Sequence, residues 1–189
     1  METLVNYEPP PTAERFFRSN AKVRLLMGPV GSGKSTACLV ELFRRCAEMP
    51  HGKDGFRRSR WVITRNTLPQ LRTTTLKSWL QWFPDGVAGS WKESEKTFFL
   101  HVGDIRAEIL FLPLDSPEDT RRLLSLELTG AFINETREVA PEIIQAIISR
   151  LGRFPSRAMM PTDPKTGRAK DYWYGLVMDT NPPSKDSFL

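Results

Sequence analysis

The chain has few cysteines, no long apolar run and no visible export signal. Its two cysteines, Cys38 and Cys46, lie in one predicted helix, where eight residues correspond to about 12 Å of rise, too far for a disulfide. The apolar runs are short, Ile109–Leu112 being typical of the longest, so none could cross a bilayer. The first residues lack a basic segment followed by an apolar stretch. These absences argue against a disulfide scaffold or a membrane protein and predict a reducing, cytoplasmic compartment.

The composition predicts one folded domain whose positive charge is unevenly distributed. Of the 189 residues, 40% are hydrophobic and 26% are charged, which suits a single domain with its own core. The net charge is +5, but segment 44–77 alone carries +7, because only Glu48 and Asp54 oppose nine basic residues: Arg44, Arg45, Lys53, Arg57, Arg58, Arg60, Arg65, Arg72 and Lys77. Such a cluster is typical of a surface that binds a polyanion such as a DNA backbone, and equally of a solvated, arginine-rich loop over 51–59.

Apolar periodicity predicts strands that alternate with helices. Strands are expected at 23–27, 61–64, 96–102, 105–112, 131–133 and 174–178, and helices at 34–48, 68–83 and 141–151. The two central strands flank a Gly103-Asp104 turn, which is typical of a hairpin. The fold class is therefore α/β, a mainly parallel sheet flanked by helices with an antiparallel hairpin addition. We expect residues 1–20 to form an arm and a short helix capped by Thr12, and residues 21–189 to form the main domain.

A glycine-rich segment between the first strand and the next helix matches the pattern G-x-x-x-x-G-K-[ST]. It comprises Gly28, Pro29, Val30, Gly31, Ser32, Gly33, Lys34 and Ser35. The glycines let backbone N–H groups surround phosphate oxygens, and the helix N-terminus adds its dipole. Lys34 is expected to reach the β- and γ-phosphates, and the Ser35 hydroxyl is expected to hold Mg²⁺.

A second polar site follows the apolar strand near residue 133. Asn134 and Glu135 stand where a Walker B pair of carboxylates would lie, at the carboxyl end of the strand and beside the P-loop. Glu135 is expected to position and deprotonate the attacking water. Asn134 keeps an oxygen acceptor but lacks negative charge, so it predicts weaker support for the metal. The alternative is a strand that ends in two surface residues.

The last predicted strand also ends in polar residues. Thr180 and Asn181 could sense the γ-phosphate and pass its loss to the following segment, or they could form an ordinary exit from the strand. Asp179 could supply the carboxylate that is missing at Asn134.

An ATPase that drives motion often uses an arginine to stabilise the transferred phosphoryl group. The candidates are Arg121 and Arg122 before the Walker B strand, Arg150 and Arg153 after it, and Arg65 at the end of the second strand. Each could instead be a surface or DNA-facing arginine.

With these motifs assembled, the chain resembles the N-terminal ATPase domain of a tailed-bacteriophage terminase large subunit, the viral DNA-packaging motor. The matching segments are Gly28–Thr36, Leu124–Glu135 and Asn181–Pro183, and the resemblance covers about residues 15–185 in order. It implies a P-loop NTPase fold of the ASCE type that binds ATP and Mg²⁺ through Lys34, Ser35 and Thr36. It also implies that Glu135 is catalytic and that Thr180 and Asn181 form the coupling motif.

The resemblance also implies partners and a setting. The family works as a homo-oligomeric ring on a portal protein, is recruited by a small terminase subunit, and threads double-stranded DNA into a procapsid. No membrane is expected among its partners. An arginine near Arg121 or Arg122 would act on a neighbour's nucleotide, and the phage-encoded protein would lie in the host cytoplasm. Two departures stand out: Asn134 replaces the family's usual Asp, and the family's nuclease domain has no counterpart. We therefore expect an ATPase fragment that does not cut DNA.

Two other functions remain open from the residues. A small-molecule kinase would use the loop from Met159 to Lys170, with the nearby basic residues Arg157, Lys165, Arg168 and Lys170, as a lid over the donor phosphates. A nucleotide-gated DNA-binding or assembly module would bind ATP and DNA without turnover.

Overall fold

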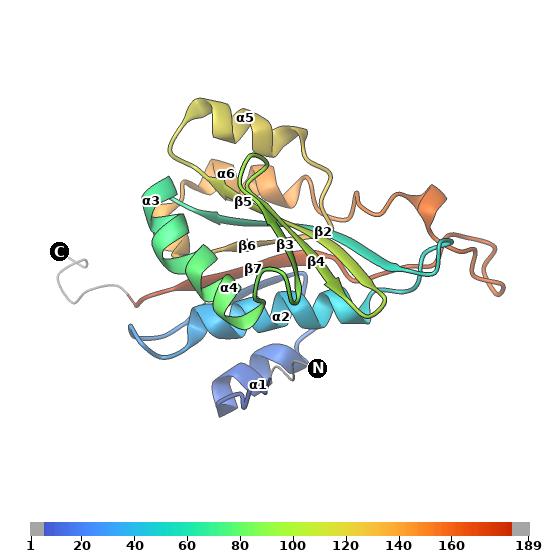
Figure 1. Ribbon diagram of the computed structural model, residues 1–189, viewed down its shortest axis with the longest axis horizontal. Coiled ribbons are helices and arrows are strands. Elements are labelled where there is room, and N and C mark those ends of the chain that lie inside the picture. The colour runs from blue at the N-terminus through green and yellow to red at the C-terminus, as the bar shows by residue number, and fades with distance from the viewer. Residues whose placement is uncertain (1–5, 183–189) are drawn as a thin grey trace.

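A computed structural model describes residues 6–182 and contains one mixed, seven-stranded sheet (Figure 1). The spatial order of the strands is β1-β7-β6-β2-β5-β4-β3. Neighbouring strands are parallel from β1 to β5 and antiparallel across β5, β4 and β3. Their bounds are β1 Val23–Met27, β2 Arg57–Arg65, β3 Gly89–Lys92, β4 Thr97–Val102, β5 Ile105–Pro113, β6 Gly130–Ile133 and β7 Gly175–Thr180. This confirms the predicted α/β class with its hairpin addition.

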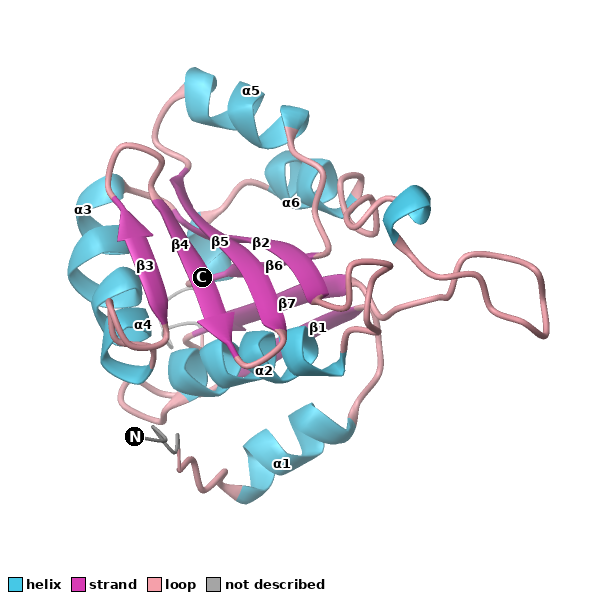
Figure 2. Ribbon diagram, turned by 45° about the vertical axis from the view of Figure 1, so that its right-hand side comes forward, coloured by secondary structure: helices cyan, strands magenta, loops and turns pink. Residues whose placement is uncertain are grey.

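Helices cover both faces of the sheet (Figure 2). α1 and α2 lie on one side, and α5 and α6 lie on the other. The helical bounds are α1 Pro11–Arg18, α2 Lys34–Glu48, α3 Leu68–Gln70, a π-helical segment Leu71–Leu76, α4 Lys77–Trp82, α5 Pro117–Ser125 and α6 Pro141–Ile148. Two short 3₁₀ turns occur at Thr136–Glu138 and Arg157–Met159.

The alternation of side chains along the parallel strands divides the apolar residues between two cores. On β2, Trp61 and Ile63 join the core under α2 and α4, whereas Val62 joins the core under α5 and α6. Gly130 allows the Trp61 ring to approach β6, because a Cβ there would lie 2.2 Å from a ring carbon. Ala13 and Phe16 place α1 in the same core as α2.

Several elements differ from the sequence-based expectation. β2 begins at Arg57, inside the segment interpreted as a basic loop, because its backbone pairs with β5 from Arg57 opposite Ile105 onward. β3 and α5 were not predicted; α5 is short, and Ser116 caps it by accepting from the Asp119 amide at 3.1 Å. The expected Thr12 cap was wrong: Pro10 occupies the N-cap and no side chain caps α1.

Other expectations hold or lie outside the described part. Cys38 and Cys46 are both free, as the helical spacing predicts, and both are buried. Within residues 6–182, no helix is both long and apolar enough to span a bilayer. Pro183 and residues 1–5 lie outside the described residues, as does the part of the predicted main domain beyond 182.

Candidate nucleotide site

The P-loop follows β1 directly, and two of its glycines have a backbone conformation that other residues avoid. The φ angles of Gly31 and Gly33 are +77° and +76°. A Cβ at Gly28 would lie 3.1 Å from the Ser32 hydroxyl oxygen, so glycine lets the loop close tightly. α2 begins at Lys34, and the free N–H groups of its first turn point out of that end. The loop and the helix end therefore form a cradle that fits phosphate oxygens.

The Lys34 side chain reaches from the P-loop to the end of β7. Its ammonium donates to the Pro29 carbonyl oxygen at 2.8 Å and to the Asn181 side-chain oxygen at 3.0 Å. The residue is 8% exposed. Lys34 is not part of any ion pair among the described residues. A nearly buried cation held only by neutral acceptors suits a site for an anion.

Glu135 follows β6 in a left-handed backbone conformation, with φ +57° and ψ +59°. Non-glycine residues in this region are strained, and such strain occurs often at functional sites. The Glu135 carboxylate accepts from the Asn181 side-chain nitrogen at 2.8 Å and from the Asn181 backbone amide at 3.3 Å. Asn181 thus connects Lys34 to Glu135 through its two amide atoms. The residues expected to bind phosphate and to activate water therefore lie together.

Ser35 contacts Asp179, the residue that the sequence suggests as a source of the carboxylate missing at Asn134. Its hydroxyl donates to the Asp179 carboxylate at 2.5 Å. The register places Ile133 opposite Met178, so the residues that follow, Asn134 and Asp179, are neighbours at the carboxyl edge. The Asn134 side-chain nitrogen donates to both Asp179 oxygens, at 2.9 and 3.1 Å.

The expected orientation of Asn134 differs from the observed one. We expected its amide oxygen to face the metal position beside Ser35, but its nitrogen lies there, 3.2 Å from the Ser35 hydroxyl. The Asn134 oxygen instead accepts from the Thr75 hydroxyl at 2.8 Å. The physical reason is the neighbouring Asp179 carboxylate, which attracts amide N–H donors and repels the amide oxygen.

Sequence reasoning missed the role of Thr75 and of the N-terminal arm. Thr75 lies in the π-helical segment, a feature that often marks functional sites, but no motif points to it. The arm residues Pro10, Thr12 and Ala13 line a cleft beside the P-loop together with Leu26, Met27, Gly28, Pro29, Ser32, Gly33, Lys34 and Ala37. Only the tertiary fold brings the arm to the loop.

The remaining predicted residues occupy less central places. Val30 is 85% exposed at the tip of the loop, and Thr36 is half-buried in the first turn of α2. Thr180 is buried, and its hydroxyl donates to the Asn181 carbonyl oxygen at 3.3 Å. The Gly28 amide donates to the Thr180 carbonyl at 3.3 Å, which joins the P-loop to the end of β7.

No protein-family model and no curated protein sequence matches this chain, whereas solved structures do. The large terminase of a thermophilic bacteriophage has a TM-score of 0.65 at 11% identity over 85% of this chain. The Thermus phage P74-26 large terminase ATPase domain has a TM-score of 0.60 at 18% identity over 95%. The chain has the fold of a large-terminase ATPase domain.

A third terminase shares this fold, that of bacteriophage HK97, with a TM-score of 0.61 at 12% identity over 92% of the chain. The chain spans 34% of the length of the first terminase, 33% of the HK97 protein and 67% of the P74-26 domain. The first of these terminases, from the thermophilic bacteriophage, has also been solved in complex with ATP-gamma-S and with ADP.

The arginine candidates lie at different places in this terminase ATPase fold. Arg121 and Arg122 are exposed on α5, and the Arg122 guanidinium donates to the Glu95 carbonyl oxygen at 3.3 Å, away from the P-loop. Arg153 is exposed after α6, where its guanidinium donates to the Ser149 carbonyl oxygen at 3.1 Å. Arg65 ends β2 at the carboxyl edge and donates to the Thr74 hydroxyl at 2.5 Å. In the described residues, none of these side chains is hydrogen-bonded to the P-loop or to Glu135.

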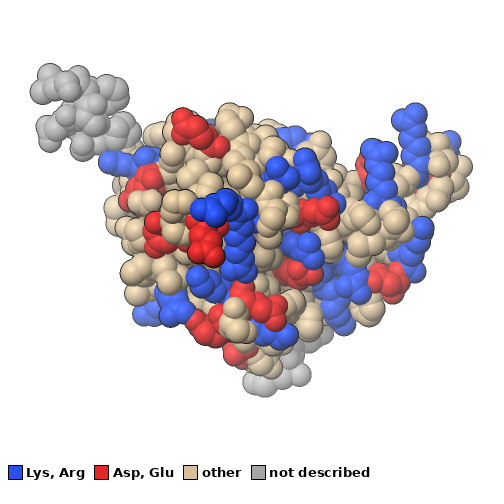
Figure 3. Space-filling view, turned by 90° about the horizontal axis from the view of Figure 1, so that it is seen from above, with Lys and Arg blue, Asp and Glu red and all other residues tan. Residues whose placement is uncertain are grey.

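Six of the nine basic residues of segment 44–77 form ion pairs in the structure. Acidic partners from other parts of the chain pair with it: Asp104 with Arg57, Glu108 with Arg60, and Glu93 with Arg72. Local partners neutralise others of the nine basic residues, namely Arg44, Arg45 and Arg58. Figure 3 shows acidic and basic side chains interspersed over the face that carries α5 and α6.

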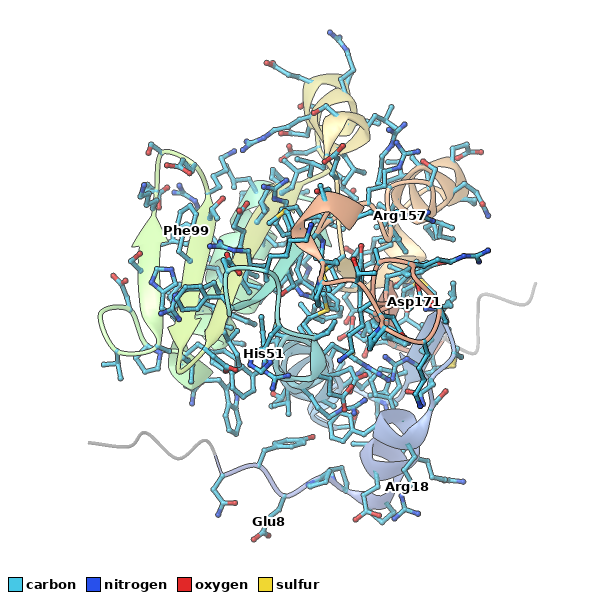
Figure 4. The ribbon with its side chains drawn as sticks, turned by 90° about the vertical axis from the view of Figure 1, so that its right-hand side faces the viewer. Glu8, Arg18, His51, Phe99, Arg157 and Asp171 are labelled. Carbon is cyan, nitrogen blue, oxygen red and sulfur yellow. The ribbon has the colours of Figure 1, made fainter. Side chains whose placement is uncertain are left out.

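The loop considered as a kinase lid lies at the wrong end of the sheet. Residues 159–170 join α6 to the start of β7, at the amino edge of the parallel strands, whereas the P-loop follows the carboxyl end of β1. Figure 4, seen from this amino edge, shows Arg157 and Asp171 near the two ends of the loop. The loop residues line a pocket that includes no P-loop residue. This position argues against the loop as a lid over the donor phosphates of the P-loop.

Proposed function

We propose that this chain is the ATPase part of a phage terminase large subunit, which hydrolyses ATP to drive double-stranded viral DNA into a procapsid. The observation that carries the proposal is the convergence of Lys34, Ser35, Glu135 and Asn181 at the carboxyl edge of a sheet with the terminase ATPase fold. Ligands bind at this edge in open α/β sheets.

The P-loop would hold the triphosphate of ATP. Its backbone N–H groups and the start of α2 face the phosphates, and the Lys34 ammonium would exchange its two neutral acceptors for phosphate oxygens. The ATP-gamma-S complex of the thermophilic-bacteriophage terminase supports nucleotide as the ligand of this fold. Mg²⁺, when bound beside Ser35, would neutralise charge on the phosphates.

Glu135 would act as the general base. Its carboxylate accepts the proton of a water whose oxygen forms a bond to the γ-phosphorus, while the bond from that phosphorus to the bridging oxygen breaks. ADP and inorganic phosphate are the products. In the arrangement described above, Asn181 donates to this carboxylate and accepts from Lys34, so phosphate binding at Lys34 would loosen Asn181. This exchange is how Thr180 and Asn181 would couple the nucleotide state to the chain beyond β7.

Assembly would complete the site. Arg121 and Arg122 on α5 lie away from their own P-loop, which suits an arginine that acts on the nucleotide of a neighbouring copy in a homo-oligomeric ring. The proposed partners are the portal protein, the small terminase subunit and double-stranded DNA, and the proposed setting is the host cytoplasm.

Glu135→Gln should abolish Mg²⁺-dependent phosphate release while keeping nucleotide affinity. Removal of a general base lowers the rate by about 10²- to 10⁴-fold. Phosphate release would be measured over a range of protein concentrations, and binding would be followed with a fluorescent ATP analogue. The matched control is Glu138→Gln, an exposed carboxylate three residues away, which should keep the wild-type rate.

The same assay distinguishes the motor from its alternative. A rate per chain that rises with concentration, and that Arg121→Ala or Arg122→Ala removes, would support the trans arginine. Binding of ATP and DNA without turnover at any concentration would instead indicate a nucleotide-gated assembly module. Wild-type turnover in Glu135→Gln would contradict the assigned base.

A further inference from the structure

Asp179 is a fully buried carboxylate whose partners are all uncharged. It is 0% exposed, and it accepts from the Ser35 hydroxyl at 2.5 Å and from the Glu135 backbone amide at 2.8 Å. The Asn134 side-chain nitrogen donates to both of its oxygens. None of the ion pairs among residues 6–182 includes Asp179.

No cationic side chain of the described residues pairs with Asp179, and every hydrogen bond that it receives comes from a neutral N–H or O–H donor. Buried carboxylates in proteins are normally paired with a cationic side chain or bound to a metal ion. Asp179 also contacts the very hydroxyl that a P-loop uses for Mg²⁺. The chemistry of this donor set therefore fits a divalent cation.

Asn134 is oriented as a support for Asp179 and not as a ligand. Its oxygen is engaged by Thr75, which is 3% exposed, and its nitrogen faces Asp179. Turning the amide over would place its oxygen about 3 Å from the Asp179 oxygens and its nitrogen against the Thr75 hydroxyl. The Asp179 carboxylate, which only accepts, therefore sets which end of the Asn134 amide faces it, and the Thr75 hydroxyl holds the other end in place.

We propose that Asp179, on the strand next to the Walker B strand, supplies the carboxylate that supports Mg²⁺ beside Ser35, and that Asn134 and Thr75 are positioning residues for it. The carboxylate missing at 134 is thus replaced from the neighbouring strand. This inference rests on the proposed nucleotide function, because it concerns the metal of the same site.

The test is the Mg²⁺ dependence of ADP binding, which requires no turnover. A fluorescent ADP analogue would be titrated into the full chain in EDTA and then at increasing Mg²⁺. Asp179→Asn should raise, by at least about tenfold, the Mg²⁺ concentration at which the enhancement of ADP affinity is half-maximal. The affinity for ADP in EDTA should be unchanged. Thr75→Val, a milder change, should raise it severalfold. Asp171→Asn, an exposed carboxylate at the opposite edge of the sheet, is the control.

The outcomes separate the two levels of the proposal. Folded Asp179→Asn and Thr75→Val variants, checked by thermal melting, that keep the wild-type Mg²⁺ dependence would overturn the role of Asp179. If Asn134→Ala loses the Mg²⁺ dependence while the other two variants keep it, Asn134 and not Asp179 would be the residue that supports the ion. A wild-type chain that binds no ADP with or without Mg²⁺ would overturn the proposed function, and the metal role with it.

Discussion

Glu41 and Asp179 are both carboxylates with 0% exposed surface, yet their surroundings differ in charge. Glu41 on α2 forms ion pairs with Arg24 at 2.6 Å, Arg45 at 2.8 Å and Arg44 at 2.7 Å. Asp179 receives hydrogen bonds from neutral groups only. The first carboxylate is compensated within the chain, whereas the second, on our proposal, is held ready for a cation from solution. Burial alone therefore does not distinguish a structural carboxylate from a ligand; the charge of its partners does.

The partners of Glu41 also explain its structural role. Arg24 and Arg45 donate onward to backbone carbonyl oxygens at the end of α1, namely those of Phe16 and Ser19. The network thus fastens the N-terminal arm to β1 and α2. The arm in turn lines the cleft beside the P-loop.

The largest expected effect is on the stability of the Glu41 network. Glu41→Gln leaves the buried Arg24 without a counter-charge and leaves Arg45 with Glu48 alone. Removing one partner of a buried ion pair costs about 3–5 kcal/mol. Urea denaturation followed by circular dichroism would measure the loss. The control is Glu14→Gln, which removes an exposed pair with Arg18 and should change stability by less than about 0.5 kcal/mol. If Glu41→Gln lowers the free energy of unfolding by less than about 1 kcal/mol, the contrast between Glu41 as a structural carboxylate and Asp179 as a ligand would not hold.

Asp179→Asn should destabilise the nucleotide-free chain less, by about 2 kcal/mol. An amide at 179 keeps an acceptor for the Glu135 N–H, but its own nitrogen meets the donors of Asn134 and Ser35. That cost is partly offset because no charge remains buried. The same urea experiment, carried out without Mg²⁺, would compare it with Glu41→Gln. Equal losses for the two variants would show that Asp179 is a structural carboxylate as well.

The smallest expected effect is on the pH dependence of stability, through the buried thiols of Cys38 and Cys46. Burial raises the pKa of the Cys46 thiol to about 12 and that of Cys38 well above its usual value. Between pH 9 and 12 the unfolded chain loses the Cys46 proton while the folded chain keeps it, so stability falls as pH rises. One thiol contributes about 1 kcal/mol of this loss at pH 9.5.

Cys46→Ala isolates this contribution. The variant loses packing at every pH, so the decisive quantity is the decrease in unfolding free energy from pH 7 to pH 9.5. That decrease should be about 1 kcal/mol smaller than in the wild type. An unchanged pH slope would mean that Cys46 titrates normally in the folded protein.

Local pattern was enough to predict much of the fold. The bounds of α2 and β1, the P-loop between them and the hairpin across Gly103 all follow from periodicity and turn chemistry, which act over a few residues. The position of Glu135 at a strand end was predictable for the same reason. β3 was missed because it has only four residues and is stabilised by pairing with β4. α5 was missed although Ser116, Pro117 and Asp119 form a helix-start pattern at its first turn.

The sequence by itself determined which residues could bind phosphate and activate water; the tertiary structure decided which of them touch. The register of β6 and β7 places Asp179 beside Asn134, so the carboxylate turns the amide nitrogen toward itself, and the π-helical segment brings Thr75 to the amide oxygen. Pairing between distant parts of the chain also gives Arg57 and Arg60 acidic partners that cannot be read from the basic segment itself. Residue types set chemical capacity, whereas Coulomb and hydrogen-bond energies depend on distances that only the folded chain fixes.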